Sequence, residues 1–476
     1  MSAAQPTTSE GSRPRLLLIS YRFPPESYPL AIGLRGVVRS LQDDWDIDVI
    51  TAAKNAEPFS NVTVHHVPGR SIEPGLRALS SMRLDKIARL LTWPDPYWPW
   101  IWPALRRAEQ VIERRRPDAI LVFMMPFSTG FVGTLLKKRT GLPLVMNLND
   151  SPTCSDMRPV YPTRGHYALF RWMEDHFIRS ADRVVYVSRQ NRDRVRTRQP
   201  PHLRDRLELV RCSADLPAPP EGPASTTSPP PDWRPFRIVY TGALSGWHAL
   251  DKDPSPSLVK RAYRAWNELG TYVRTPLDVS THSPVYVGQA VRRGIDMHPE
   301  WEGRIQVDVY GNTFPEPVVQ RVLEAHDLTT IVNVHGRIPH DEAMQHVQEA
   351  DLLFLTLPDR LDGSAGGRIS LKTYEYLLTD RPILAAVPPG ENREFLSDHA
   401  GTYLTDPKDV GAMTKVIETL ATQRFSGRSL SVERPGLEEA LSSTTRASAL
   451  SSILRKVAVC PNDDVDRAHA PSLSST

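Results

Sequence analysis

Short apolar runs without polar alternation recur along both halves of the chain, and they constrain the fold more than any other feature. In the first half they are RLLLIS (15–20), IDVIT (47–51), AILVFM (119–124), PLVMNL (143–148) and VVYVS (184–188). In the second half they are FRIVYTG (236–242), IQVDVYG (305–311), IVNVHG (331–336), DLLFLTL (351–357) and PILAAV (382–387). Such runs are typical of strands buried on both faces. Segments with helical spacing separate them, so the sequence predicts an α/β fold of parallel, doubly wound sheets.

A proline-rich segment divides the chain. Eight of its 44 prolines lie within residues 216–235, where Ser, Thr and Ala leave little to bury, a composition that favours an extended linker. We therefore expect two Rossmann-like domains, residues 14–215 and 236–435, facing each other across a cleft. Residues 436–457 are predicted to form a helix that packs back toward the N-terminal domain, and residues 1–13 and 461–476 are predicted to be disordered.

Composition and spacing argue against several classes of protein. The 476 residues contain 58 Lys and Arg against 55 Asp and Glu, and a net charge of +3 gives no field that favours nucleic acid. The three cysteines lie far apart, and the 14 histidines show no metal-binding spacing, so we expect neither disulfides nor a metal or other cofactor. The absence of a long apolar run and of an apolar leader predicts a cytoplasmic protein.

The segment DGSAGGRISLKTYEYLLTDRPILA (362–385) carries the strongest chemical signal. Its glycines precede a helix expected to begin near Ser370, so free backbone N–H groups and the positive end of the helix converge where a phosphate can bind. Lys372 and Glu375 share one face of that helix, and Arg368 adds a second cation. This arrangement suits a nucleoside diphosphate. The alternative is that Lys372 and Glu375 form an exposed ion pair and the glycines only turn the chain.

The sequence resembles the retaining glycosyltransferases of GT-B fold called group one or family four, particularly their cell-envelope polysaccharide members. The resemblance covers most of residues 15–425 and is carried by four blocks, LLLISYRFPPES, GLPLVMNLNDSP, RSADRVVYVS and VNVHGRIPHDEAMQHVQEADLLFLTLP, the last continuing through GRISLKTYEYLLTDRPILAAV. It implies transfer of a sugar from a nucleotide sugar to a hydroxyl of a saccharide or lipid-linked acceptor. It also implies retained anomeric configuration, without a glycosidase-type pair of carboxylates.

The resemblance further implies roles for individual residues. Lys372 and Arg368 would stabilise the leaving diphosphate, and they are the expected catalytic residues. The expected donor-binding residues are Glu375 for the ribose, the loop residues Gly366, Gly367 and Ser370 for the diphosphate and sugar, and Arg337 and Ile338 for the base. On the acceptor side we expect Arg35, Asp150 and Glu26 to face the cleft.

Three positions depart from the pattern of the family. Gly367 stands where many relatives have a second glutamate, and the first loop has only Gly33 in place of a Gly-Gly pair. The loop YTGALSGWHALDKD lacks the usual arginine, so His248 and Lys252 are the expected substitutes, and Gly242 of the same loop is also expected to contact the donor. Two other hypotheses therefore stay open: a nucleotide-sugar epimerase or hydrolase of the same fold, and a catalytically silent partner in a polysaccharide-synthesis complex.

Residues 77–116 combine charge with aromatic rings. They hold nine basic against four acidic residues and include Trp93, Trp98, Trp100 and Trp102. Amphipathic rings beside basic helices suit an anionic membrane surface, which predicts peripheral contact with the inner face of the plasma membrane. The alternative is an ordered hydrophobic loop that packs over the core of the domain.

Overall fold

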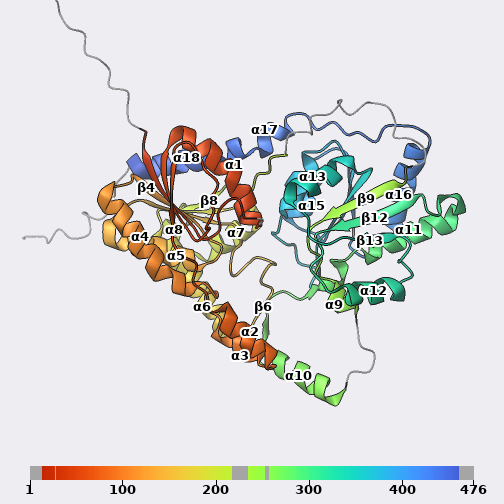
Figure 1. Cartoon of the computed structure of the whole chain (residues 1–476), viewed down its shortest axis with the longest axis horizontal. Helices are drawn as coiled ribbons and strands as arrows, with labels where there is room; N and C mark the ends of the chain where they lie inside the picture. Colours follow the sequence, from red (N-terminus) through yellow and green to blue (C-terminus); the bar gives the residue numbers. More distant parts are fainter. Residues whose placement is uncertain (1–12, 27, 217–233, 252–256, 460–476) are drawn as a thin grey trace, which may run out of the picture.

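A computed structural model of the chain describes residues 13–26, 28–216, 234–251 and 257–459. It contains two parallel sheets, each enclosed by helices and forming its own lobe (Figure 1). This confirms the predicted pair of doubly wound domains. Most of the predicted linker 216–235 and of the predicted disordered ends, 1–13 and 461–476, lies outside the described residues.

The N-terminal sheet has seven parallel strands in the order β3-β2-β1-β4-β5-β7-β8. Strand order reverses between β1 and β4, and this reversal places the carboxyl ends of these two strands beside the cleft. The strands are β1 (Arg15–Ser20), β2 (Asp46–Thr51), β3 (Val62–His66), β4 (Ala119–Phe123), β5 (Leu144–Leu148), β7 (Arg183–Tyr186) and β8 (Leu207–Leu209).

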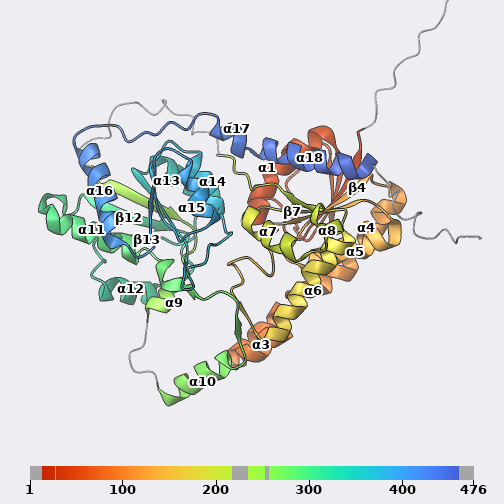
Figure 2. The same cartoon turned by 180° about the vertical axis from the view of Figure 1, so that it is seen from behind.

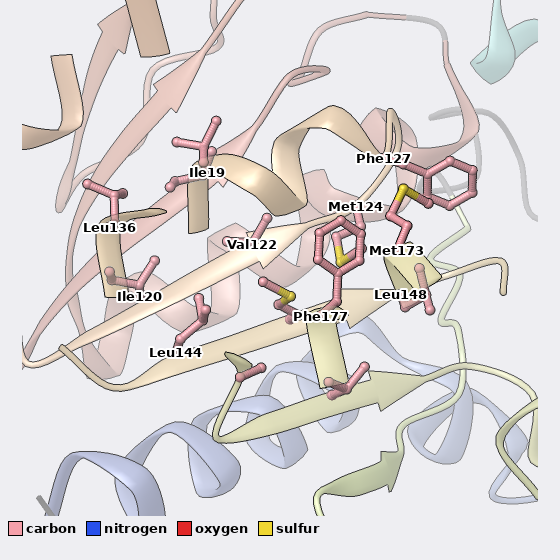
Figure 3. Packing of buried hydrophobic residues seen from close by; sticks show 14 of the residues in the cluster. Ile19, Ile120, Val122, Met124, Phe127, Leu136, Leu144, Leu148, Met173 and Phe177 are labelled. Atoms are coloured by element: carbon pink, nitrogen blue, oxygen red, sulfur yellow. The ribbon is translucent and has the colours of Figure 1, made fainter. Parts of the chain in front are cut away.

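Helices cover both faces of this sheet. On one face, apolar side chains of β1, β4 and β5 pack against α4, α5 and α6, as Figure 3 shows for Val122, Leu136 and Phe177. Helix α1 covers the other face with Leu34, Val38 and Leu41, which follow helical spacing. The helices of this lobe are α1 (Pro29–Asp44), α2 (Glu73–Ser81), α3 (Asp85–Leu91), η1 (Trp98–Trp100), α4 (Ile101–Arg114), α5 (Ser128–Thr140), α6 (Arg164–Ser180), α7 (Arg189–Arg198) and α8 (Pro201–Arg204).

The C-terminal sheet has six parallel strands in the order β13-β12-β9-β14-β16-β17. Its strand order reverses between β9 and β14, so the loops after these strands form the expected ligand edge. The strands are β9 (Phe236–Thr241), β12 (Ile305–Tyr310), β13 (Val332–Val334), β14 (Leu352–Thr356), β16 (Ile383–Ala386) and β17 (Thr402–Thr405).

Helices enclose this sheet as well, and two apolar clusters fill the space on its two faces. The helices are α9 (Trp247–Leu250), α10 (Leu258–Glu268), η2 (Val279–Thr281), α11 (Val285–Met297), η3 (Pro299–Trp301), α12 (Glu316–Ala325), α13 (His340–Glu349), α14 (Leu371–Leu377), α15 (Glu391–Ser397) and α16 (Val410–Phe425).

The last two helices are α17 (Leu437–Leu441) and α18 (Ser443–Val459). Leu437 and Leu441 of α17 still join an apolar cluster of the C-terminal lobe, and α18 returns to the N-terminal lobe. Helix α18 lies along α1, where Leu450 and Leu454 join the apolar cluster of the N-terminal sheet. Trp45 donates its indole N–H to the Ser451 hydroxyl at 2.9 Å, which fixes the two helices relative to each other.

An arm projects from the two lobes, built from α2, α3, the first half of α6, and α10 (Figures 1 and 2). Helix α10 comes from the C-terminal half of the chain and lies against α3, where Arg89 donates to the Asn267 carbonyl at 2.9 Å. A short antiparallel pair, β6 (Val160–Tyr161) with β10 (Tyr272–Val273), also joins the halves. A second pair joins β11 (Leu277–Asp278) to β15 (Asp359–Arg360). Among the described helices, none has the length and apolar character needed to cross a bilayer.

Candidate active site

The first residue of the candidate site is Gly242, which lies where the strand order of the C-terminal sheet reverses. It follows β9 with a φ of +108°, a conformation that favours glycine. A Cβ atom there would lie 2.8 Å from Cε and 2.9 Å from Nζ of Lys372. Gly242 therefore lets the lysine side chain, which comes from α14, lie directly on the end of β9.

Lys372 and Arg368 are two neighbouring cations that form no ion pair among the described residues. Within the described ranges, neither side chain makes a hydrogen bond or an ion pair; Lys372 Nζ lies 5.2 Å from the centre of the Tyr240 ring. Burial and repulsion from Arg368 lower the pKa of Lys372 to about 8, although Glu375 opposes this shift. The pair therefore creates a local excess of positive charge that a bound anion would relieve.

His282 lies next to these cations and is held neutral. Burial, together with the charges of Arg368 and Lys372, lowers its pKa to about 3. Its Nδ1 atom accepts from the Ser245 backbone N–H at 3.3 Å and lies 2.8 Å from the Ser245 hydroxyl oxygen. The neutral ring thus anchors the loop after β9. His282 is not among the residues predicted from the sequence, because its segment has no motif that links it to residues 368–372.

Glu375 lies one turn beyond Lys372 and faces a cleft of about 270 Å³ between the lobes. Its carboxylate lies 2.8 Å from Nε2 of His340, and this bond raises the pKa of the histidine. Arg35 lines the opposite wall from α1, where it forms an ion pair with Glu57 at 2.7 Å. The predicted donor residue Glu375 and the predicted cleft residue Arg35 thus face the same space.

The glycine loop before α14 is pressed against the N-terminal lobe. A Cβ atom on Gly367 would lie 2.5 Å from Oδ1 of Asn191 and 2.7 Å from Oγ of Ser188. This leaves no room for the glutamate that many relatives have here, and it explains the departure in physical terms. Gly366 makes an equally close approach, since its Cβ would lie 2.7 Å from Oδ2 of Asp156.

Ser370 forms the boundary between this loop and α14. Its extended backbone precedes the helix, and its hydroxyl lies 3.1 Å from the hydroxyl of Thr373 instead of capping a backbone N–H. The side chain is buried. Ser370 therefore fixes the start of a short helix whose next residues carry Lys372 and Glu375.

Glu391 joins the lobes beside the glycine loop. Its buried carboxylate accepts hydrogen bonds from the backbone N–H groups of Arg189 at 2.8 Å and Gln190 at 2.9 Å. It also accepts from the Ser188 hydroxyl at 2.6 Å and from Arg211 at 2.9 Å. A helix of one lobe thus supplies the N-terminal cap of α7 in the other. No sequence signal could have identified this contact, because the partners lie about 200 residues apart.

The two other predicted acceptor-side residues, Asp150 and Glu26, lie in different settings, and Glu26 lines neither interlobe cavity. Asp150 follows β5 and lines a smaller cavity, where burial raises the pKa of its carboxyl while Ser155 and Arg368 oppose the shift. Glu26 lies in the loop after β1 and forms an ion pair with Arg22 at 3.0 Å. Asp150 therefore lies close enough to Arg368 for their charges to interact, whereas Glu26 pairs with a residue of its own loop.

Three further predicted donor residues make no hydrogen bond or ion pair with Lys372 or Arg368 among the described residues, and Lys252 lies outside those residues. Arg337 is exposed and has no hydrogen bond among the described residues, and Ile338 packs against the core of its own lobe. His248 is also exposed, with its ring 4.8 Å from that of Phe314. None of the three lines either interlobe cavity. Across the described ranges, no group of three or more His, Cys, Asp or Glu side chains is placed to hold a metal ion.

Comparison with known proteins supports this architecture. A family model described as "Glycosyl transferase 4-like domain" matches residues 30–212. No curated protein is similar enough in sequence to match the chain.

Among solved structures, sucrose-phosphate synthase from Thermosynechococcus elongatus aligns with a TM-score of 0.58 at 12% identity, over 94% of this chain and 99% of that protein. The α,α-trehalose 6-phosphate synthase of Burkholderia multivorans aligns with a TM-score of 0.54 at 14% identity, over 97% and 100% of the two chains. HepE of Anabaena, solved in complex with UDP and glucose, aligns with a TM-score of 0.54 at 13% identity, over 93% and 100%. The chain therefore has the GT-B fold, and its residues 30–212 match a glycosyl transferase 4-like domain.

Proposed function

We propose that this protein is a retaining glycosyltransferase that moves a sugar from a nucleotide-sugar donor to an acceptor hydroxyl. One observation carries the proposal: Lys372 and Arg368 lie together, with no hydrogen bond or ion pair to their side chains among the described residues, where the strand order of the C-terminal sheet reverses. A diphosphate would supply the missing negative charge. The family match over residues 30–212 and the UDP bound to HepE support the same substrate class.

The proposed chemistry places charge stabilisation at Lys372 and Arg368. As the bond between the anomeric carbon and the diphosphate oxygen breaks, negative charge develops on the leaving group, and two preorganised cations lower the free energy of that transition state. The backbone of Gly366, Gly367 and Ser370 would hold the donor from the loop side. Glu375 would accept hydrogen bonds from the ribose hydroxyls and would not exchange protons with the substrate.

Other assignments rest mainly on the family resemblance. We propose that the base lies near Arg337 and Ile338, that His248 and Gly242 border the donor, and that Arg35, Asp150 and Glu26 border the acceptor. We further propose that the cations neutralise the diphosphate without a metal cofactor. A chelator should therefore leave turnover unchanged, whereas a chelator-sensitive reaction would contradict this part of the proposal.

A donor screen tests the function directly. UDP, GDP and ADP are titrated by calorimetry, and the matching nucleotide sugars are incubated with and without candidate acceptors. We expect one nucleotide to bind and its sugar to be transferred, and Lys372→Ala and Arg368→Gln each to reduce turnover about 100-fold or more. Lys415→Ala, an exposed lysine on α16, is the matched control and should behave like the unchanged protein.

Two outcomes of this screen would contradict the proposal. A folded protein that binds none of the three nucleotides would favour the catalytically silent partner. Conversion of a nucleotide sugar that no acceptor alters would favour the epimerase or hydrolase.

We also propose that the enzyme acts in cell-envelope polysaccharide or glycolipid synthesis and docks on the inner face of the plasma membrane through its arm. Within residues 77–116, Trp100 is fully buried and donates to the Val67 carbonyl at 3.1 Å, whereas Trp98 and Trp102 stay exposed. The packed-loop alternative therefore applies to Trp100. Docking must use the exposed apolar side chains of the arm, which are Met82, Ile87, Leu91, Leu169, Trp172, Leu258, Val259, Trp266 and Leu269.

Charge on the arm favours an anionic surface. Residues 73–91 and 257–269 contain seven basic and three acidic residues. Helix α10 buries none of its residues, although Lys86 of α3 lies 4.3 Å from the Trp266 ring. An amphipathic helix that buries no side chain within its own protein, beside basic residues, is suited to lie in a membrane interface.

Liposome sedimentation tests this docking. The unchanged protein should pellet with vesicles that contain anionic lipid and stay in solution with zwitterionic ones, and Leu91→Ser with Trp266→Ser should abolish pelleting. Met297→Ser, an exposed apolar residue of α11 outside the arm, is the control. Equal pelleting with both lipid types, or no effect of the double variant, would refute docking through the arm.

A further inference from the structure

A second interlobe cavity, of about 130 Å³, lies beside the larger cleft. Its walls come from the first turn of α1, from Asn149 and Asp150 after β5, and from Ile369 and Leu371 of the opposite lobe. Gly33 and Leu371 line both spaces. The cavity therefore adjoins the proposed donor site on its N-terminal side, and none of the proposed donor contacts fills it.

The guanidinium of Arg446 reaches this cavity from α18. Only 6% of the residue is exposed, and its buried Nε has no hydrogen-bond partner. Its one hydrogen bond within the described chain is a long one, from Nη2 to Oδ1 of Asn149 at 3.5 Å. An arginine stays charged in proteins, and a buried cation without a carboxylate is costly unless something pairs with it.

The first turn of α1 forms another part of the same wall. Pro29 and Leu30 line the cavity, and the N-cap residue Tyr28 provides no side-chain acceptor for the free N–H groups of the turn. The amino end of a 16-residue helix and an unpaired buried guanidinium thus converge on one small cavity. Asp150 is the carboxylate of this wall, and it forms no ion pair with Arg446 in the described structure.

We propose that this cavity binds an anionic substituent, a phosphate or a carboxylate, of the sugar acceptor, and that Arg446 is its positioning residue. This inference rests on the proposed glycosyltransferase function. Arg446 belongs to the acceptor side, because α18 packs on α1 through Ala447 and Leu450. The donor diphosphate already has Lys372 and Arg368 on the opposite lobe. Asp150, held by the Ser155 hydroxyl at 2.8 Å, lies where it can accept a hydrogen bond from an acceptor hydroxyl.

Calorimetry with saturating UDP measures sugar binding at this cavity separately from binding at Lys372 and Arg368, because UDP occupies that proposed cation pair. Glucose 6-phosphate, glucuronate and glucose are titrated into the unchanged protein, Arg446→Lys and Arg446→Met. At least one anionic sugar should bind about tenfold or more tightly than glucose, and Arg446→Met should remove that preference. Arg446→Lys, which keeps the charge but not the forked geometry, should retain part of it. Arg455→Gln, an exposed arginine of the same helix, should change nothing.

Three outcomes would overturn the inference. One is equal binding of all three sugars to the unchanged protein. Another is a similar loss of UDP affinity in Arg446→Met, which would assign the arginine to the donor. The third is a marked fall in the thermal stability of ligand-free Arg446→Met, because removing an unpaired buried charge should leave stability unchanged or raise it.

The test also separates this inference from the function on which it rests. If UDP does not bind the unchanged protein, the donor proposal fails, and the same sugars are titrated without nucleotide. An anionic preference that depends on Arg446 would then still support the cavity, and its absence would reject it.

Discussion

Two regions that lie close together along the chain differ in how their charged groups are paired. At the seam, defined here by Glu391 and its partners on α7, every carboxylate oxygen accepts hydrogen bonds from the opposite lobe. At the opening, defined by Arg368 and Lys372, two cations repel each other and neither forms an ion pair with a described residue. Glu375 and Asp150 attract them only from beyond ion-pair distance. The charged groups of the seam are paired within the protein, whereas those of the opening would be paired by a bound ligand.

The seam also determines the geometry of the opening. Gly366 forms a bridge with Gly390, and the Glu391 N–H donates to the Gly366 carbonyl at 2.8 Å. The loop that carries Arg368 is therefore fixed to the residues that cap α7. A change at the seam should act on stability, whereas a change at the opening should act on ligand binding and catalysis.

Replacing Lys372 with methionine should have the largest effect. Turnover should fall about 100- to 1,000-fold, because one of two charges that stabilise the leaving diphosphate is lost. The free energy of unfolding should stay the same or rise, since the variant removes a partly buried cation that Arg368 repels. Steady-state kinetics and urea unfolding measure the two effects. If the variant unfolded more easily but kept its turnover, the opening would contribute to stability and not to catalysis, which would contradict the comparison.

Replacing Glu391 with alanine should have the next largest effect, on stability. Two backbone N–H groups, a hydroxyl and the Arg211 guanidinium would lose their shared acceptor, which should cost about 3 kcal/mol of unfolding free energy. Glu394→Ala is the control, because its ion pair with Arg189 is half exposed and should contribute less than about 1 kcal/mol. Equal effects of the two variants in urea unfolding would show that burial of the seam does not matter.

The strands and the fold class could be predicted because these strands are buried on both faces and leave continuous apolar runs. The predicted run 15–20 is β1, and the predicted run 305–311 contains β12 (Ile305–Tyr310). Lys372 and Glu375 could be placed together because helical spacing is a local property. Helical spacing could not predict that Gly242 lies against Lys372 or that His340 bonds Glu375, because Gly242 and His340 come from other elements.

The contacts of the seam and the existence of the arm could not be predicted from the sequence. Glu391 meets α7 only through tertiary folding, and nothing in its local pattern distinguishes it from an exposed acid on a helix. The tryptophan cluster shows the same limit, because Trp98 and Trp100 are two residues apart yet one is half exposed and the other fully buried. The apolar residues of α10 lie on a helix whose exposure no local pattern reveals.

Adding a methyl group at Gly367 should cost less than breaking the seam. The new Cβ would overlap Asn191 Oδ1 and Ser188 Oγ, so Gly367→Ala should lower the unfolding free energy by about 1–3 kcal/mol. Gly336→Ala is the control, because a Cβ atom there meets nothing within 4 Å. Urea unfolding compares the two. Equal stability of Gly367→Ala and Gly336→Ala would mean that the loop and α7 are not held in contact.

The smallest expected effect is a dependence of nucleotide binding on pH. With a pKa of about 8, Lys372 is mostly charged at pH 7 and mostly neutral at pH 9.5, so UDP affinity should fall across this range, by up to about tenfold. The unfolded lysine has a pKa near 10.4, so the unfolded state binds more protons from about pH 8 to 10.4, and the contribution of this group to stability should rise there. Calorimetry at each pH measures the affinity, and Lys372→Met should remove the trend. If the UDP affinity of the unchanged protein did not vary with pH, Lys372 would not contact the nucleotide.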